Sequence, residues 1–406
     1  MSAATMAPGR ADSRNALIAA FLGWTLDAFD YFILVFVLAP VALEFHKSAP
    51  QIALTLTASL AMRPLGALLF GFLADRYGRR LPLILSILFY SVMEIFSGLA
   101  PSYRIFLFLR LLYGVGMGGE WGVGAALAME ASPVARRGIL SGILQEGYAL
   151  GYLLAALAYW AVFPHWGWRP MFFLGGLPAL LTLFIRAKVK ESPAWRAGPA
   201  SKIGWREYFR AVAANGKRFS YLVLLMAMMN FISHGTQDIY PTFLQQQLRF
   251  TPRATSLVTA ISMLGAIAGG ILVGHYSDRW GRRRMMSAAA LVALLLIPLW
   301  VLGPGIAWIA AGAFLMQFMV QGAWGVIPAH LNELSPGALR GFFPGFAYQL
   351  GVLPASLAPT IETLMAHRYI TYAQSLGAFA AAALSIGAYV IAAGPEAHRT
   401  PFVRDD

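Results

Sequence analysis

Long apolar stretches separated by short polar ones run along almost the whole chain. Each has about 20 residues or more, enough for a helix rising ~1.5 Å per residue to cross roughly 30 Å of hydrocarbon. Twelve such segments are predicted, at residues 17–42, 50–74, 81–100, 105–130, 138–163, 168–187, 219–247, 254–276, 284–302, 306–333, 340–365 and 370–393. The pattern predicts an all-α polytopic membrane protein with twelve transmembrane helices.

Composition and charge support this interpretation. Hydrophobic residues make up 58% of the 406 residues and charged residues only 12%, about half of what a soluble domain carries. When successive loops are assigned to alternate sides, 23 Lys and Arg residues fall on one side and six on the other. This bias follows the positive-inside rule, so the net charge of +13 reflects topology and not nucleic-acid binding. We expect an inner (plasma) membrane protein with both termini cytoplasmic.

The chain contains an internal repeat with an offset of 203 residues. GFLADRYGRR begins at Gly71 and GHYSDRWGRR begins at Gly274. The same offset relates the following pairs: Trp121 and Trp324, Glu130 and Glu333, and Arg137 and Arg340. Duplication predicts an N-terminal six-helix half at 1–187, a basic cytoplasmic linker at 188–218 and a C-terminal half at 219–406. Two parallel repeats are typical of secondary transporters, whose substrate site lies between the halves at the midplane.

The loop G-x-x-x-D-R-x-G-R-R between the second and third helices resembles the signature loop of the major facilitator superfamily. The resemblance implies the twelve-helix major facilitator fold, alternating access and no enzyme activity. It also implies a cytoplasmic latch, in which Asp75 and Asp278 are placed to accept hydrogen bonds from the N-terminus of a neighbouring helix. The other latch residues are Arg79, Arg80, Glu130, Arg137, Arg282, Arg283, Glu333 and Arg340, with Glu130–Arg137 and Glu333–Arg340 as expected pairs.

Several ionisable residues fall at membrane depth, where each costs at least ~2.5–3.5 kcal/mol and is a functional candidate. Arg63 lies 12 residues before Asp75, roughly 18 Å along a helix and therefore near the bilayer centre. We expect Arg63 to face the cavity between the halves and to bind a carboxylate. The alternative is an internal ion pair with Asp27, Asp30 or Glu120. Both aspartates are central in the first helix and are also expected to face the cavity.

Two other carboxylates, Glu94 and Glu362, are expected at a helix interface or the cavity rim, and a position near the outer surface is the alternative for Glu362. Arg110 lies only about five residues from the outer end of the fourth helix. The glycines that follow it are expected to allow close helix packing.

One polar stripe occupies the seventh helix, in the sequence NFISHGTQDIYPT at 230–242. Its members recur at helical spacing and share one face: Asn230, His234, Gln237 and Asp238. Gly235 and Pro241 weaken this helix, as is typical where a transporter helix lines a binding cavity. The alternative is ordinary helix–helix hydrogen bonding, worth ~0.6 kcal/mol per contact. We expect the stripe to face water and substrate.

The pattern N-x-x-S-H-x-T-Q-D-x-x-x-T from Asn230 to Thr242 resembles the helix 7 signature of lactate/pyruvate:proton symporters related to the yeast lactate permease. These belong to the sialate/lactate:proton symporter family. R-P-L-G at Arg63, G-G-E-W-G at Gly118, Q-G-A-W-G at Gln321 and Y-Q-L-G at Tyr348 are similar to that group as well. The resemblance implies a proton-coupled symporter that imports a small monocarboxylate, lactate or pyruvate.

The predicted substrate-binding residues are Arg63, Asn230, His234, Gln237, Gln321, Trp324 and Gln349. The candidates for proton coupling are, in order, Asp238, Asp27 with Asp30, and Glu120 with Glu146. His234 either relays the proton, since its unperturbed pKa of ~6.5 is suitable, or donates a hydrogen bond to the substrate as a neutral ring.

No cofactor or metal is expected, and the absence of cysteine excludes disulfides and thiolate metal sites. The expected partners are a small organic anion, protons and the lipid bilayer, with the protein as a monomer. Two alternatives stay open. One is a symporter of a larger organic acid, such as sialate or an aromatic acid. The other is a non-transporting membrane sensor on a transporter scaffold, whose mark would be a degraded latch loop or an added cytoplasmic domain.

Overall fold

A computed structural model describes residues 10–47, 49–197 and 204–402, and these residues form helices and connecting loops without any strand. Four long helices open the N-terminal half, and two broken spans complete it. In order they are α1 (Arg10–Glu44), α2 (Ala49–Tyr77), α3 (Arg80–Gly98), α4 (Tyr103–Glu130), α5 (Arg137–Gln145) with α6 (Gly147–Trp166), and α7 (Arg169–Leu174) with α8 (Pro178–Lys188).

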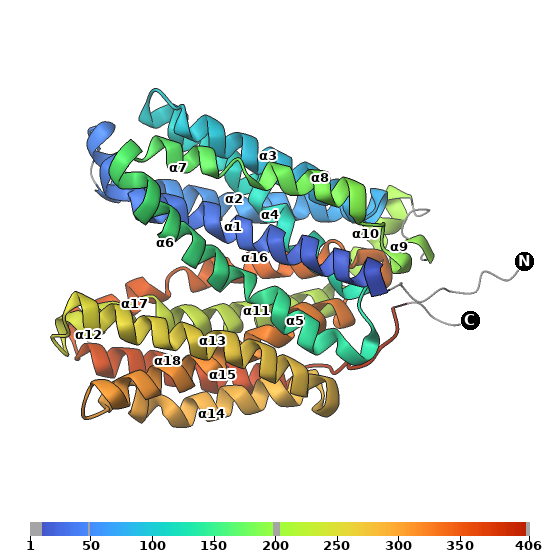
Figure 1. The fold of residues 1–406 in the computed structure, drawn as a ribbon. Helices are drawn as coiled ribbons and strands as arrows, with labels where there is room; N and C mark the ends of the chain where they lie inside the picture. The colour runs from blue at the N-terminus through green and yellow to red at the C-terminus, as the bar shows by residue number, and fades with distance from the viewer. Residues whose placement is uncertain (1–9, 48, 198–203, 403–406) are drawn as a thin grey trace, which may run out of the picture.

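The C-terminal half repeats this plan beside the first half (Figure 1). Its spans are α11 (Gly216–Gln237) with α12 (Tyr240–Gln246), α13 (Pro252–Trp280), α14 (Arg282–Leu302), α15 (Ile306–Leu334), α16 (Phe343–Ala355) with α17 (Ala358–Arg368), and α18 (Tyr372–Ala393). Two short helices, α9 (Pro193–Ala197) and α10 (Trp205–Ala214), connect the halves. We call the end of the molecule where α9 and α10 lie the linker end, and the opposite end the open end.

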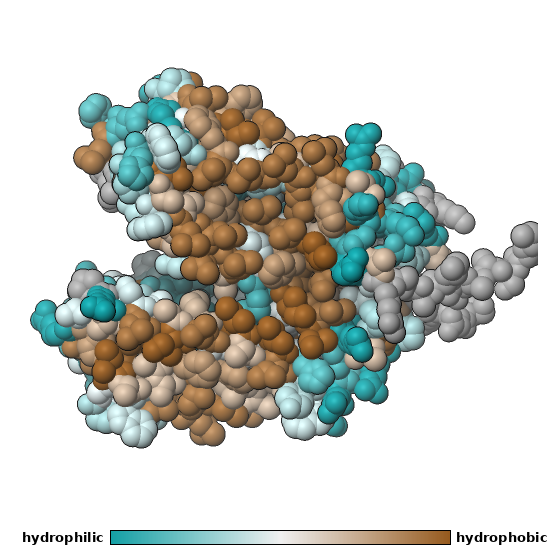
Figure 2. Space-filling model, in the orientation of Figure 1, coloured by the Kyte–Doolittle hydropathy of each residue, from teal (hydrophilic) through white to brown (hydrophobic). Residues whose placement is uncertain are grey.

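The helices form a membrane-spanning bundle. Among the described residues, ten segments are long and apolar enough to cross a bilayer, and α4 and the α16–α17 pair are the other two spans. Figure 2 shows a broad hydrophobic belt between two more hydrophilic ends. The prediction of an all-α bundle of twelve spans in two six-helix halves is therefore confirmed.

Close packing of matched helix pairs makes each half rigid. A Cβ added at Gly66 on α2 would collide with the backbone carbonyl of Val115 on α4. The pair related by the 203-residue offset behaves in the same way, because a Cβ at Gly269 on α13 would collide with the carbonyl of Phe318 on α15. Small residues let transmembrane backbones approach closely, so these glycines bring together the helices that carry the polar residues of the centre.

Four of the spans are interrupted. The break between α11 and α12 falls at Asp238 and Ile239, where Gly235 and Pro241 indicated a weak helix. The breaks after α5, α7 and α16 were not predicted from the sequence. Non-helical backbone at membrane depth occurs where protein or a water-filled cavity surrounds it, and three of these breaks lie in spans that line the central cavity described below.

The two halves meet at the linker end and separate at the open end. Figure 2 shows a hollow between them that faces away from α9 and α10. In this view the hollow gives access to the centre of the molecule from the open end (Figure 2).

Candidate functional site: a central cavity and a closed linker end

A cavity lies between the two halves, and the space within it, together with the part that opens to solvent, is about 650 Å³. Most of the residues predicted to bind substrate or protons from the C-terminal half line it, together with one arginine from the N-terminal half. These residues are Arg63, Asn230, His234, Gln237, Asp238, Gln321 and Trp324. Gln349 is buried next to Tyr348 and is not on the cavity wall.

Arg63 both faces the cavity and forms an internal ion pair, the two positions that the sequence left open. It lines the cavity and is 7% exposed, and its Nη2 donates a hydrogen bond of 2.8 Å to Oδ2 of Asp27. Asp27 itself is fully buried behind the arginine. The expectation that Asp27 and Asp30 face the cavity is wrong for this conformation. Arg63 stands between Asp27 and the cavity, and Asp30 points towards the turn at Gly175 between α7 and α8.

A second group of charges is buried inside the N-terminal half. Arg110 donates hydrogen bonds to Glu94 at 2.6 Å and to Ser97 at 2.6 Å, and its guanidinium lies 4.2 Å from the ring centre of Tyr113. Glu94 is therefore a buried partner of Arg110 and not a residue of the cavity rim. This pair holds α3 against α4.

Three further carboxylates lie away from the cavity wall. Glu120 is fully buried beside Gly23 of α1, and none of its oxygens has a hydrogen-bond partner among the described residues. Glu146 lies at the α5–α6 break and faces Gly270 of the other half. Glu362 is fully buried with both oxygens unpartnered within the described chain, so it is not at the outer surface.

The polar stripe of α11 and the break that follows it face the cavity and are oriented by hydrogen bonds. Nδ1 of His234 lies 3.0 Å from Oδ2 of Asp238, and both side chains are 34% exposed. Gln237 donates to Gln317 of α15 at 2.7 Å. From the same helix, Gln321 donates to Ser233 at 3.2 Å. The stripe therefore combines helix–helix hydrogen bonds with exposure to the cavity.

Sequence reasoning missed the aromatic part of the wall. Trp24, Tyr31, Tyr148 and Tyr348 line the cavity beside Trp324. Aromatic residues at helical spacing in an apolar segment look the same as ordinary core residues. Only Tyr348 had a signal, because it opens the Y-Q-L-G stretch.

The repeat offset shows where the two halves have diverged. Adding 203 to Arg63 gives Ala266, and adding it to Asp27 gives Asn230. The cation and the buried acid of the N-terminal half therefore have neutral counterparts in the C-terminal half.

Two aspartates at the linker end accept backbone N–H groups of the opposite half. Oδ1 of Asp75, at the end of α2, accepts the backbone N–H of Gly341 before α16 at 2.7 Å. Asp278, at the end of α13, accepts the N–H groups of Gly138 and Ile139 in the first turn of α5 at 2.8 and 3.1 Å. A negative charge is favourable at a helix N-terminus. For Asp278 the structure shows the hydrogen bonds to a helix N-terminus that the sequence led us to expect, whereas Asp75 binds the turn that precedes its helix. All of these bonds run between the halves.

The linker contributes to the same closure. Tyr208 of α10 donates its hydroxyl to Oδ2 of Asp75 at 3.1 Å. Burial, followed by the neighbouring Asp75 carboxylate, raises the pKa of Tyr208 well above its usual value. The hydroxyl therefore stays protonated as a donor.

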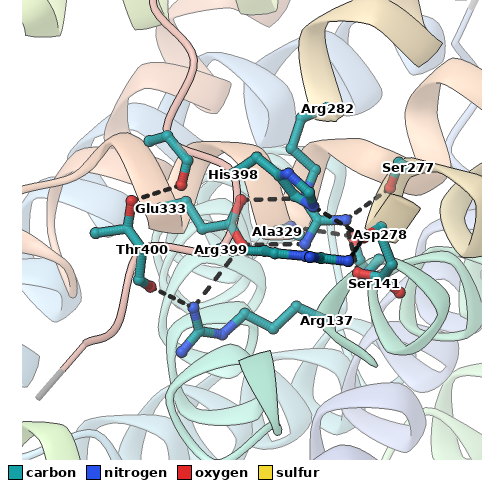
Figure 3. A network of polar contacts seen from close by, with 12 residues as sticks. Arg137, Ser141, Ser277, Asp278, Arg282, Ala329, Glu333, His398, Arg399 and Thr400 are labelled. Atoms are coloured by element: carbon teal, nitrogen blue, oxygen red, sulfur yellow. Dashed lines mark hydrogen bonds and ion pairs between the residues drawn. The ribbon is translucent and has the colours of Figure 1, made fainter. Parts of the chain in front are cut away.

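The glutamates of the latch pair differently from the expectation. Glu130 accepts from Arg79 at 2.9 Å and lies 3.5 Å from Arg340 of the other half. Glu333 accepts from Arg282 at 3.0 Å and lies 3.8 Å from Arg137 of the other half (Figure 3).

The predicted pairs Glu130–Arg137 and Glu333–Arg340 are therefore wrong, because each arginine reaches across to the opposite half. The helix that follows Arg137, α5, packs against α13 and α15 of the C-terminal half, which turns the guanidinium towards Glu333. The remaining two latch arginines, Arg80 and Arg283, use their backbone N–H groups to bind glutamate side chains that lie outside the spans. The backbone N–H of Arg80 donates to Glu191 at 3.1 Å and that of Arg283 to Glu396 at 2.9 Å.

Comparison with known families and proteins agrees with this architecture. Residues 20–359 and 223–404 match the Major Facilitator Superfamily. The chain belongs to this superfamily. It is therefore a multi-pass membrane transporter and not an enzyme. Within the described ranges, no group of His, Asp and Glu residues is arranged to hold a metal ion.

Similar proteins of this superfamily are named as transporters of organic acids. The chain is 30% identical to a "Carboxylic acid transporter protein homolog" of Saccharomyces cerevisiae over 87% of its length, but it spans only 62% of that protein. It is 31% identical to a "Probable 4-methylmuconolactone transporter" of Cupriavidus pinatubonensis, covering 96% of this chain and 92% of that one. "Sialic acid transporter NanX" of Escherichia coli is 28% identical, with 88% of both chains covered.

Among solved structures, the proton:xylose symporter XylE has the same fold. The TM-score is 0.73 and the alignment covers 96% of this chain and 97% of that one. With 18% sequence identity, this likeness concerns the fold alone.

Proposed function

We propose that the protein is a proton-coupled symporter that imports an organic monocarboxylate by alternating access. One observation carries the proposal: Arg63 presents a guanidinium to a cavity whose opposite wall holds the polar stripe of α11. A guanidinium is permanently charged and binds carboxylates in a bidentate manner. The names of the similar proteins support an organic acid as the substrate.

The side of entry follows from the loop charges and the closed end together. The linker end carries the arginine-rich loops that the positive-inside rule assigns to the cytoplasm. Asp75 and Asp278 hold this end shut. The conformation is therefore outward-open in our proposal, with the substrate entering from the outside.

Coupling to protons rests on the contact between Arg63 and Asp27. An incoming carboxylate competes with Asp27 for the guanidinium. A buried carboxylate without a partner is costly, so Asp27 takes up a proton as the substrate binds. Asp238, the first candidate from the sequence, pairs with His234 where both are exposed to the cavity, and the two are placed to pass that proton inward.

Transport in proteoliposomes tests the proposal. Purified protein is reconstituted, and uptake of labelled lactate, pyruvate, benzoate and sialate is followed with the outside made acidic. We expect accumulation of at least one acid, which a protonophore abolishes. Empty liposomes and the Arg63→Ala variant are the controls. If no acid accumulates in response to the gradient, the proposal is wrong.

A further inference from the structure

Aromatic rings pack together at the base of the central cavity, where Tyr148 is 39% exposed and Trp24, Trp324 and Tyr348 are largely buried. Trp24 stacks on Tyr148 with ring centres 5.7 Å apart, and Tyr348 packs against Trp24 and Trp324 at 6.5 and 5.9 Å. Trp121 supports this surface from below, 4.6 Å from Tyr348. Indole and phenol faces of this kind bury large apolar areas and favour stacked or edge-on contact with another ring.

The base lies nearer the linker end than the polar groups of α11 and Gln321 do. Along α1, Trp24 precedes Tyr31 by seven residues, which is two helical turns. Along α15, which runs in the opposite direction, Trp324 lies closer to the linker end than Gln321 does. The cavity therefore has an aromatic floor, with polar side chains between the floor and the open end and Arg63 at one side.

A two- or three-carbon acid cannot use this floor. Lactate would satisfy Arg63 with its carboxylate but would offer the rings only a methyl group. We propose that the substrate is a carboxylate attached to a planar unsaturated ring, which lies on the floor while its carboxylate meets Arg63. This inference rests on the proposed transport of monocarboxylates and narrows the substrate to a class.

Binding to purified protein separates this inference from the function itself. Three probes of equal charge are compared by isothermal titration: benzoate, cyclohexanecarboxylate and lactate. We expect benzoate to bind about tenfold more tightly than the saturated ring acid, and more tightly still than lactate. Tyr348→Leu should weaken benzoate about tenfold and change lactate less than twofold.

The outcomes are distinct. If lactate binds as tightly as benzoate, the ring preference is wrong while carboxylate binding stands. If Tyr348→Leu weakens the binding of benzoate and lactate equally, the aromatic floor does not distinguish a ring from a small acid. If none of the three probes binds while Arg63 is intact, the organic-acid function itself fails. The melting temperature and the gel-filtration profile establish whether the Tyr348→Leu variant remains folded.

A second inference comes from the segment after α18, which crosses the linker end. The carboxylate of Glu396 accepts the backbone N–H of Arg283 at 2.9 Å. His398 and Arg399 lie 3.0 and 2.9 Å from the backbone carbonyl of Asp278, and Arg399 donates to it (Figure 3). The segment is thereby attached to the C-terminal half.

The same segment then reaches the N-terminal half. Arg137 donates to the carbonyl of Thr400 at 2.8 Å (Figure 3). The ring of Phe402 lies between two guanidinium groups, 3.4 Å from Arg137 and 3.9 Å from Arg340 at their central carbons. These arginines occupy equivalent positions of the two halves, and cation–π contacts strengthen when they are removed from water.

We infer that residues 394–402 form a strap that holds the linker end closed, with Phe402 as its anchor. Because the strap is attached to the C-terminal half and Arg137 belongs to the N-terminal half, the contacts of Arg137 with Thr400 and Phe402 must break when the halves separate at this end. Release of Phe402 therefore accompanies each opening towards the linker side, and the strap biases the protein to the outward-open state. None of the cavity residues takes part in these contacts.

The absence of natural cysteine allows a direct test. Ser141 on α5 is fully buried between the halves, where its Oγ accepts the N–H of Ala329 at 3.0 Å. In a Ser141→Cys background, the rate of alkylation by N-ethylmaleimide reports opening of the linker end. We expect Phe402→Ala to raise this rate about threefold or more. Phe108→Ala, at an exposed site on α4, is the matched control.

Equal alkylation rates in the Phe402→Ala and Phe108→Ala variants would overturn the strap. Phe402→Leu keeps the bulk and removes the ring, so it should still raise the rate if the arginine contacts are the anchor. A rate unchanged from the parent in Phe402→Leu would also overturn that part of the proposal. Melting temperatures matched between the variants exclude general loosening of the fold.

Discussion

The guanidinium of Arg63 donates a 2.8 Å hydrogen bond to Asp27 and lines the central cavity at the same time. Arg63→Lys keeps the charge but loses the planar fork, and a hydrogen bond between charged groups contributes about 1.5–3 kcal/mol. We predict that this variant inserts normally and that its KM for the transported acid rises about tenfold or more. Initial rates of uptake measure the change. Unaltered transport in Arg63→Ala would exclude the assignment, and His234 would become the best cationic candidate.

In the proposed mechanism, Asp27 couples Arg63 to the proton. Asp27→Asn cannot exchange a proton but preserves the shape of the side chain. We predict that this variant loses accumulation driven by a pH gradient while it still exchanges internal for external substrate. Counterflow in liposomes without a gradient measures the exchange. If the variant still concentrates substrate against its gradient, the proton is carried elsewhere.

Asp238 and His234 lie 3.0 Å apart and are the second place where the proton can be held. If they relay it to Asp27, Asp238→Asn should slow proton-driven uptake but leave the final accumulation ratio unchanged. If Asp238 is itself the coupling group, accumulation is abolished and counterflow remains. The accumulation ratio at steady state therefore distinguishes the two roles.

Asp75 and Asp278 occupy equivalent positions in the repeat, and each accepts backbone N–H groups of the opposite half. We predict that Asp75→Ala and Asp278→Ala each shift the population towards opening at the linker end, with little change in substrate affinity. Each substitution removes a charged acceptor and leaves buried N–H groups unpaired, at a cost of about 1–3 kcal/mol. Alkylation in the Ser141→Cys background gives the shift. A loss of affinity with unchanged alkylation would contradict a latch role.

Gly269 tests the close packing of helices within the C-terminal half. Gly269→Ala places a methyl group against the carbonyl of Phe318, so α13 and α15 must separate. Overpacking of this kind costs about 1–3 kcal/mol, and the melting temperature in detergent should fall. Gly305→Ala, where a Cβ meets nothing within 4 Å, is the control and should leave the melting temperature unchanged.

The spans and the polar stripe could be read from the sequence because each is a local pattern. Apolar length predicts a crossing, and helical spacing brings Asn230, His234 and Asp238 to one face. The offset of 203 residues located both latches. The partners within the latches could not be read in this way. Two similar motifs offer each glutamate an arginine from either copy, and the packing of the halves, such as that of α5 against α13, decides in favour of the opposite half.

The aromatic floor and the orientation of α1 were inaccessible for a different reason. Trp24 and Tyr148 are apolar residues among many, and nothing local separates a cavity wall from a helix interface. Asp27 and Asp30 were expected to face the cavity because both are charged and central. The helix can direct only part of its circumference to the cavity, and Arg63 covers Asp27 there.

The difference between Arg63 and its counterpart Ala266 has a consequence for the transported molecule. The framework of the carrier is nearly two-fold symmetric, but its centre is chemically polarised from one half to the other. A substrate anchored by its carboxylate keeps that end against the N-terminal half throughout the cycle, whichever side of the membrane the cavity faces. Passage then involves no rotation of the substrate relative to the N-terminal half, and the same end of the molecule faces Arg63 at entry and at exit.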